Sequence, residues 1–557
     1  MAIPDLVIPG AEQLAINGGT LDKAADIELQ YGYIDTFRSD KFRHFSTDPW
    51  ASSCDTVPLP ITHDFRTKVL IVGAGYVSLL FAGRLIEQGF KPEDLIFVDS
   101  AAGFGGVWYW NRYPGLMCDV ESYIYLPLIE KTGFVPKHKY SYGQELRYYA
   151  NLLAKTPGVD GRGVFRSTVT EAVRDQGNAQ WDCQLRTHTG EQVTVRADLF
   201  ILASGVLSRP RVPRIPGIEH FKGHSMSIQI VPELAKWVQE LVVFQRTPAA
   251  TDPVEFQKQV ATYSGWQKDR MINFVLFFSN LPRKSEINLV DDAWTILPSF
   301  SGVVGGPHAQ SITPDNLAQY VDIIQKLDMV RQDRVREIVH DAEIAKALHP
   351  WCSGFCKRPC FHDDYLGAFN RPNFKIVHTN AKGVEEFTER GIVSDGVEHE
   401  LDLIIFRTGF EPFTVGSPAY RAGIRIKGRG GLDMDDKWAE GVSTFHGILS
   451  RGSPNLILTG YTQAGATVNQ VHQMGVQAEH AAHIISEALK RAAADGKNRV
   501  VVEPTESAEE EWAMRVVSQA HAMAILLNCT PSYTTAESAL RADLPPEVQL
   551  KAAQGAT

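Results

Sequence analysis

The sequence has no run of 18 or more uninterrupted apolar residues, so it offers no membrane-spanning helix. Its first residues, Met-Ala-Ile-Pro-Asp, lack the basic start and the apolar core of a secretory signal. Cysteine is scarce, with 7 in 557 residues, and the odd number disfavours a framework of disulfides. These absences predict a soluble, reduced, intracellular protein of the cytoplasm with no membrane anchor.

An excess of basic residues is also absent, because the net charge is -10 and the isoelectric point is near 6.0. This balance argues against nucleic acid or an anionic membrane as a partner. Cys352, Cys356 and Cys360 are spaced by four, but Pro359 would break a helix there and no second Cys/His cluster is evident. We therefore predict no metal site. With 44% hydrophobic and 22% charged residues, the chain is typical of a globular protein of two or three domains.

The most informative pattern lies near residue 70. A short apolar run, residues 69–72, leads directly into Gly73 and Gly75, and an apolar helix pattern follows. A second apolar run, residues 95–98, ends in Asp99. The order of strand, glycine turn, helix, strand and acid is typical of a dinucleotide-binding βαβ unit.

Each residue of this unit has a physical role. Gly73 allows the tight turn, and Gly75 lets the backbone approach a pyrophosphate beside the positive end of the helix dipole. Asp99 can accept hydrogen bonds from ribose hydroxyls. The third glycine position holds Ser78, which is small enough for close packing of helix and strand.

A run rich in Gly, Trp and Tyr, residues 103–115, follows the unit. Such a run can stack on a flat ring and approach it through its backbone, although a packed aromatic loop is the alternative. Further along, the patterns predict a linker at 210–217, helices at 144–155, 231–240 and 470–493, and strands at 164–173, 181–186, 192–196, 198–205, 241–248, 401–406 and 455–460.

A second βαβ unit is incomplete in this sequence. The helix at 231–240 and the strand at 241–248 match its later part, with Arg246 where a 2′-phosphate would lie. The first strand and its glycine turn should precede this helix, yet residues 221–229 run straight into it. We therefore predict an α/β fold with two Rossmann-like units, the second truncated. We expect four parts: an N-terminal extension (1–65), a first dinucleotide-binding part (66–215), a second such part with a helical insertion (216–400), and a return to the first domain with the C-terminal region (401–557).

With these motifs in view, the chain resembles Baeyer–Villiger monooxygenases, in particular the long fungal ones that act on polycyclic or terpenoid ketones. The similarity spans roughly residues 35–545, and its carriers are residues 73–78, 105–115, 118–122, 244–248, 357–373 and 407–410. The resemblance implies that FAD and NADPH are the cofactors, so that residues 66–215 are the FAD-binding part and residues 216–400 the NADP-binding-like part. It also places Gly106, Trp108 and Tyr113 near the flavin ring. The cofactor-binding residues that it implies are Gly73, Gly75, Ser78, Asp99, Gly106, Val107, Trp108, Asp119, Tyr125, Arg246 and Lys357.

The same resemblance implies the chemistry. Arg358 matches the family's active-site arginine, whose fixed charge can stabilise a developing oxyanion, and Asp119 matches the carboxylate that orients it. Lys357 and Arg246 match positions that hold the 2′-phosphate of NADPH. The implied reaction inserts oxygen from O₂ into a bulky cyclic ketone, giving a lactone or ester in fungal terpenoid or meroterpenoid metabolism.

The sequence departs from the family at one place. Ser227 and Val231 stand where the family fingerprint has His and Trp, and a segment that includes the second GxGxxG is missing between Met226 and Ile228. A gene model that excised an exon, a decaying gene, and a protein that has given up reduction by NADPH all remain open. The alternative functions are accordingly a flavin-binding isomerase or cyclase without redox turnover, or an inactive remnant.

Overall fold

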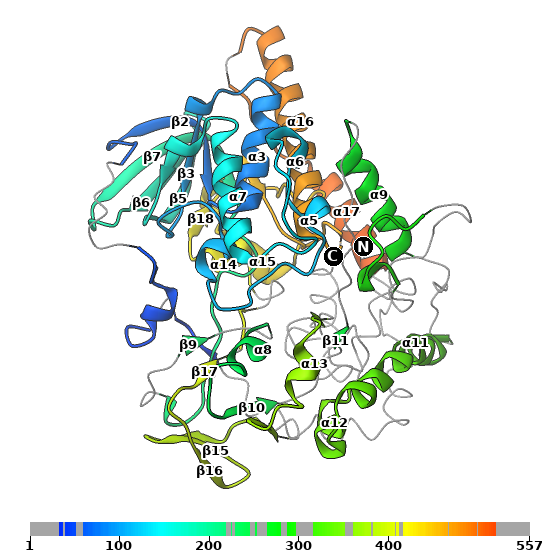
Figure 1. Ribbon diagram of the computed structural model, residues 1–557. Coiled ribbons are helices and arrows are strands. Elements are labelled where there is room, and N and C mark those ends of the chain that lie inside the picture. Colours follow the sequence, from blue (N-terminus) through cyan, green and yellow to red (C-terminus); the bar gives the residue numbers. More distant parts are fainter. Residues whose placement is uncertain are drawn as a thin grey trace.

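The computed structural model describes residues 33–36, 39–51, 59–218, 224–225, 229–245, 251–252, 264–279, 287–296, 316–350, 360–379, 383–406, 408–411, 416–465, 467–497 and 499–519. Figure 1 shows a large sheet with its helices in one half of the molecule and several small sheets in the other half. Of the helices described, none has the length and apolarity needed to cross a bilayer.

The large sheet has eight strands in the order β18-β5-β6-β7-β2-β3-β4, with β19 also beside β7. A parallel part carries the predicted βαβ unit, and an antiparallel part, β5-β6-β7, continues from it. The strands are β2 (Phe65–Val72), β3 (Leu95–Val98), β4 (Gly163–Val164), β5 (Thr168–Asp175), β6 (Gln180–Arg186), β7 (Gln192–Leu202), β18 (Arg425–Lys427) and β19 (Leu456–Leu458).

Both faces of the parallel part are buried, which explains its continuous apolar runs. In β2, Val69 and Ile71 join a core with the helices α3 (Tyr76–Glu87), α7 (Gly143–Lys155) and α16 (Gln470–Ala494). Leu70 and Val72 point to the opposite face, where they meet Trp181 of β6 and Trp438 of α15 (Met434–Glu440). The long helix α16 packs along α3, so the late part of the chain returns to the glycine corner.

The second half contains pairs of short strands instead of one sheet. The pairs are β10 (Leu241–Gln245) with β13 (Phe374–His378), β9 (His224–Ser225) with β17 (Ile405–Phe406), β11 (Thr251–Asp252) with β12 (Cys360–Phe361), and β1 (Tyr33–Ile34) with β8 (Val212–Pro213). A three-stranded sheet joins β14 (Glu386–Phe387), β15 (Gly391–Ser394) and β16 (Val397–Glu400). The remaining α-helices are α4 (Val107–Trp110), α5 (Ser122–Tyr125), α6 (Ile129–Thr132), α8 (Ile230–Leu234), α9 (Trp266–Phe278), α11 (Leu317–Ile338), α12 (Ala342–Leu348), α13 (Tyr365–Ala368), α14 (Pro418–Ala422) and α17 (Glu506–Gln519).

The predicted truncation of the second unit is visible in this arrangement. Within the described ranges, no strand joins the β10-β13 pair to the β9-β17 pair. Four of the five residues of β10 are only half-buried, whereas β3 in the first unit is fully buried. The predicted fold class, two Rossmann-like units with the second truncated, is confirmed.

Five predicted elements differ from the structure. The strands predicted at 192–196 and 198–205 are one strand, β7, whose burial changes from alternating to continuous where its partners change. The strand predicted at 164–173 is two, because β4 pairs with β3 and β5 pairs with β6. The helix predicted at 231–240 ends at Leu234, and the strand predicted at 401–406 keeps only its last two residues.

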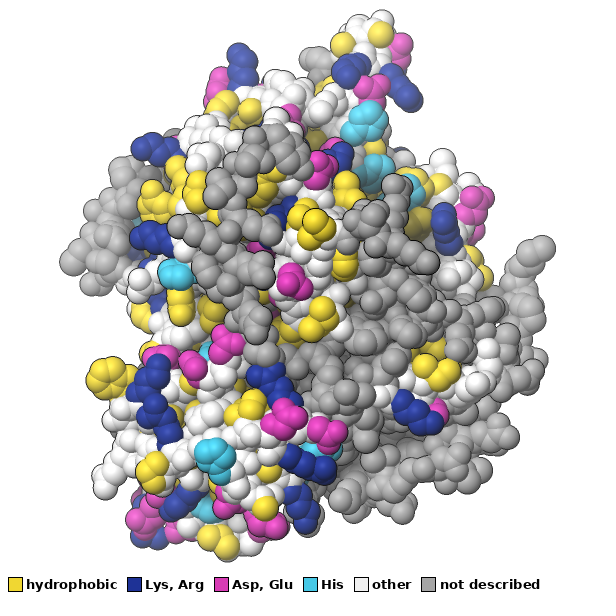
Figure 2. Space-filling view, turned by 45° about the vertical axis from the view of Figure 1, so that its right-hand side comes forward, with side chains coloured by type: hydrophobic (Ala, Val, Ile, Leu, Met, Phe, Trp, Pro, Cys, Tyr) yellow, Lys and Arg dark blue, Asp and Glu magenta, His cyan; other side chains and the backbone are white. Residues whose placement is uncertain are grey.

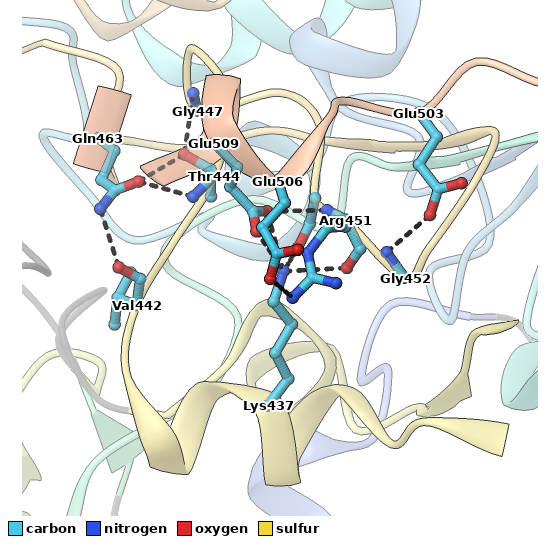
Figure 3. A network of polar contacts seen from close by, with 11 residues as sticks. Lys437, Val442, Thr444, Gly447, Arg451, Gly452, Gln463, Glu503, Glu506 and Glu509 are labelled. Atoms are coloured by element: carbon cyan, nitrogen blue, oxygen red, sulfur yellow. Dashed lines mark hydrogen bonds and ion pairs between the residues drawn. The ribbon is translucent and has the colours of Figure 1, made fainter. Parts of the chain in front are cut away.

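The last described helix, α17, is held by a polar network (Figure 3). Buried Glu509 accepts hydrogen bonds from Lys437 Nζ at 2.9 Å and from the backbone N–H of Arg451 at 2.8 Å. Trp512 donates its indole N–H to the carbonyl of Gln463 at 2.9 Å.

On the face drawn in Figure 2, the described acidic and basic side chains are interspersed and form no large field of one sign.

Candidate active site

The glycine corner at the end of β2 has the geometry that the sequence predicts. Gly73 has a φ of +110°, and its N–H donates to the carbonyl of Val98 at 2.8 Å. A Cβ at Gly73 would lie 2.3 Å from the carbonyl oxygen of Ala203, so only glycine fits. Ser78 is fully buried in α3, with its Oγ 3.2 Å from the same Cβ position, and it occupies the close contact between helix and strand.

Two glycine segments meet at this corner without side chains between them. Gly106 has a φ of +55°, and a Cβ there would lie 2.8 Å from the Cα of Gly75. The N–H of Gly105 donates to the carbonyl of Ala74 at 2.9 Å and ties the segments together. Because α3 begins directly after Gly75, its first N–H groups and its positive dipole end lie beside bare backbone. This cradle fits a pyrophosphate.

Asp99 lies at the end of β3 and is half-buried. Its Oδ2 accepts the N–H of Ala74 at 2.7 Å, and its Oδ1 accepts the N–H of Ala101 at 2.8 Å. Burial raises the pKa of Asp99, and these two hydrogen bonds act in the opposite direction. Each oxygen keeps acceptor capacity beyond these bonds. The carboxylate is therefore oriented by the backbone and can still accept ribose hydroxyls, so these residues fit the adenosine end of FAD.

An aromatic group continues from Gly106. Val107 begins α4, and the next residue, Trp108, is buried and donates its indole N–H to the hydroxyl of Tyr125 at 3.1 Å. The rings of Trp108 and Tyr125 are perpendicular, with centroids 5.9 Å apart. The ring centroid of Tyr76 lies 6.0 Å from that of Tyr125. Burial raises the pKa of Tyr125 well above its usual value, so its hydroxyl stays protonated. The structure brings together Val107, Trp108 and Tyr125 as a wall beside the cradle.

Asp119 lies in the turn before α5 and is half-buried. Its carbonyl oxygen accepts the indole N–H of Trp294 at 2.8 Å. Two residues later, buried Glu121 forms two short hydrogen bonds with Arg270 of α9, at 2.5 and 2.6 Å. Burial raises the pKa of Glu121, although Arg270 lowers it.

Three predicted site residues, Arg246, Lys357 and Arg358, lie outside the described residues. Within the part of the chain that is described, no group of three or more His, Cys, Asp or Glu side chains is arranged to hold a metal ion.

Comparison with known proteins decides the family. The chain is 40% identical to the FAD-binding monooxygenase ausC of Emericella nidulans, over 94% of this chain and 85% of that protein. It is 37% identical to the polycyclic ketone monooxygenase of Thermothelomyces thermophilus, over 93% of this chain and 88% of that protein. No protein-family model matches the chain.

The chain belongs to the FAD-binding monooxygenases of the Baeyer–Villiger type. Solved structures of this family agree with the fold. A solved structure of the polycyclic ketone monooxygenase from Thermothelomyces has a TM-score of 0.88 with 34% identity. The match covers 98% of this chain and 94% of that chain. An oxidised steroid monooxygenase bound to NADP has a TM-score of 0.66 with 25% identity, and covers 84% of this chain and 93% of its own.

The alignments also bear on the truncation of this monooxygenase. The alignment with the Emericella protein is 586 positions long, which exceeds the 557 residues of the whole chain. That relative therefore carries residues with no counterpart here. The gap that the sequence predicts, between Met226 and Ile228, lies outside the described residues.

The sequence did not identify several residues that shape this monooxygenase's corner. Asp48 Oδ2 accepts the hydroxyl of Tyr109 at 2.8 Å and the N–H of Ala102 at 2.9 Å, so a polar N-terminal segment supports the glycine-rich loop. The guanidinium of Arg112 lies 4.6 Å from the ring of Trp50 and 4.7 Å from that of Tyr109. No local motif marks Asp48 or Trp50, because their roles depend on contacts about 50 residues or more away in the sequence.

Proposed function

We propose that this chain inserts one oxygen atom of O₂ into a bulky cyclic ketone and releases a lactone or ester. The second oxygen atom leaves as water, and two electrons from NADPH balance the reaction. The glycine corner carries this proposal, because Gly73, Gly75, Gly106 and Asp99 form a cradle that suits a dinucleotide. The names of its relatives, among them a polycyclic ketone monooxygenase, support the substrate class.

The residues have the following proposed roles. Gly73 and Gly75, with the N-terminus of α3, bind the pyrophosphate of FAD, and Asp99 accepts the ribose hydroxyls. Gly106 and Trp108 face the flavin ring. When bound, FAD supplies the redox chemistry that links NADPH to O₂.

For the ketone we propose a charged pair. Arg358 holds a fixed positive charge toward the oxyanion that develops on the ketone oxygen, and Asp119 orients this guanidinium. Phe361, three residues after Arg358, packs on Trp294, whose indole N–H is bound to Asp119. This chain of contacts supports the pairing.

Reduction by NADPH depends on the second, truncated unit. We assign Arg246 and Lys357 to the 2′-phosphate, yet the separate β10-β13 and β9-β17 pairs leave no glycine turn for the NADPH pyrophosphate in the described second half. This interruption favours a second candidate, a flavin-dependent isomerase or cyclase without redox turnover.

One experiment separates the two candidates. The FAD-loaded protein is reduced by dithionite under argon and mixed with O₂ and a polycyclic ketone, and the products are analysed by mass spectrometry. A product heavier by one oxygen atom is expected, and its absence would refute oxygen insertion. An isomer of the ketone formed under argon with oxidised FAD would instead support the second candidate. A parallel titration with NADPH measures whether bleaching of the flavin survives the truncation.

A further inference from the structure

Trp294 links two parts of the candidate site. It is 1% exposed and lies in the 3₁₀ turn Ala293–Ile296. Its indole N–H donates to the carbonyl of Asp119 at 2.8 Å, and its ring meets that of Phe361 with centroids 4.4 Å apart at 65°. Phe361 is also buried, and it belongs to β12. A single side chain therefore contacts both the turn that carries Asp119 and the strand that follows Arg358 in the sequence.

The turn that carries Trp294 is fixed by its own hydrogen bonds. Thr295 donates from its backbone N–H and from its Oγ1 to the carbonyl of Asp292, at 3.0 and 2.7 Å. The hydroxyl of Tyr140 donates to Asp292 Oδ2 at 2.9 Å, which attaches the turn to the half of the molecule that contains the large sheet. Since all three of these residues are buried, the indole has little freedom to move.

A second contact to the turn around Asp119 comes from α9, which precedes the Trp294 turn in the sequence. Glu121 receives two hydrogen bonds from Arg270 of α9, and Arg270 also donates to the carbonyl of Leu289 at 2.5 Å. Residues 264–279 and 287–296 thus hold the turn at two points that both follow the Cα of Asp119, namely the carbonyl of Asp119 and the side chain of Glu121. A backbone fixed in this way restricts the rotamers that the Asp119 side chain can adopt.

We propose that Trp294 is a positioning residue for Asp119. Its N–H sets the orientation of the Asp119 peptide, so that the carboxylate is directed toward the site of oxygen insertion. This inference rests on the proposed function, because it assumes that Asp119 acts there. Phenylalanine keeps one ring against Phe361 but removes the N–H donor together with part of the volume of the indole, so the control must lose the same atoms at another place.

The test compares Trp294→Phe with a matched control. Trp512→Phe removes an equivalent bond, from an indole N–H to the carbonyl of Gln463 at 2.9 Å. Each FAD-loaded protein is reduced by dithionite and mixed with O₂ and a polycyclic ketone. The ratio of lactone to hydrogen peroxide and the rate of flavin reoxidation are measured from about pH 6 to about pH 9. The affinity for FAD is measured in parallel.

For Trp294→Phe we expect the ratio of lactone to peroxide to fall about fivefold, the factor that corresponds to about 1 kcal/mol. FAD affinity should be unchanged, and Trp512→Phe should match the unmodified protein. An unchanged ratio in Trp294→Phe, or an equal fall in the control, would overturn the inference. If the unmodified protein forms no lactone, oxygen insertion itself fails. The reoxidation rate without ketone then decides about Trp294: slowing confined to Trp294→Phe supports a positioning role, and equal rates refute it.

Discussion

Replacing Arg270 by methionine tests the buried ion pair between Arg270 of α9 and Glu121, the residue before α5. Arg270 is 8% exposed and Glu121 is 1% exposed, and two hydrogen bonds of 2.5 and 2.6 Å join them. Methionine keeps most of the length of the side chain but leaves Glu121 as a buried carboxylate without its partner. Breaking a buried pair in this way costs about 3–5 kcal/mol. We expect the free energy of unfolding of Arg270→Met to fall by this amount.

The assay is urea unfolding followed by tryptophan fluorescence at several pH values. Burial already raises the pKa of Glu121 above that of the unfolded chain, and loss of Arg270 raises it further. The folded state then binds the proton more tightly than the unfolded state, so stability falls as pH rises. The loss in Arg270→Met is therefore expected to be greatest at alkaline pH and to shrink when Glu121 becomes protonated.

An exposed pair provides the control. The side chain of Arg390 is 66% exposed and binds Glu398 and Glu400 at 2.7 and 2.6 Å. Exposed pairs contribute at most about 1 kcal/mol, so Arg390→Met should change stability little. The reasoning is refuted if Arg270→Met costs no more than Arg390→Met. It also requires that Arg270→Met combined with Glu121→Gln recovers part of the loss, because no buried charge is then left alone.

Three further outcomes are expected. Gly106→Ala should weaken FAD binding about tenfold in a fluorescence titration, because its Cβ would lie 2.8 Å from Gly75 Cα at a φ of +55°; unchanged affinity would contradict the close approach. Asp99→Asn should also weaken FAD binding about tenfold, since an amide cannot accept from two backbone N–H groups with both of its ends. His446 and His480 are hydrogen-bonded at 2.9 Å, and burial lowers the pKa of both. The unfolded chain therefore takes up protons first as pH falls, and calorimetry should show the melting temperature dropping below about pH 6.5, less steeply in His480→Gln.

The glycine corner could be predicted because its determinants are local. Gly73, Gly75 and Asp99 lie within one strand-turn-helix-strand segment, in which periodicity and turn chemistry act over a few residues. The structure places Asp99 against the backbone of the glycine turn, because β3, which ends just before Asp99, is the parallel neighbour of β2. That the aromatic run lies near the flavin ring stays a prediction, whereas the close backbone approach of Gly106 to Gly75 is a feature of the structure.

The contacts around Asp119 could not be predicted in the same way. Trp294 lies 175 residues after its partner Asp119 in the sequence, and Arg270 lies 149 residues after its partner Glu121. Their own segments have ordinary helical and turn patterns, so nothing local marks either residue as part of a site. The errors at β7 have a related cause. The first part of β7 pairs with β6 and its later part with β2, and the burial of its side chains changes from alternating to continuous. In the sequence this change of pattern resembles the end of one strand and the start of another.

The two halves of the molecule differ in how completely their strands are paired and buried, and each half is expected to bind a different cofactor. In the half that contains the large sheet, β2 lies between β3 and β7, and residues 69–72 of β2 are all buried. In the second half, β10 pairs only with β13 among the described strands, and its apolar residues are half-exposed. A first strand with a glycine turn would normally cover this edge and hold a second pyrophosphate. The cradle for FAD does not depend on that strand, because each of its contacts lies within residues 72–106 or comes from β7 and the segment after it. FAD binding and oxygen insertion can therefore persist where reduction by NADPH is impaired, which is why chemically reduced flavin provides the decisive assay.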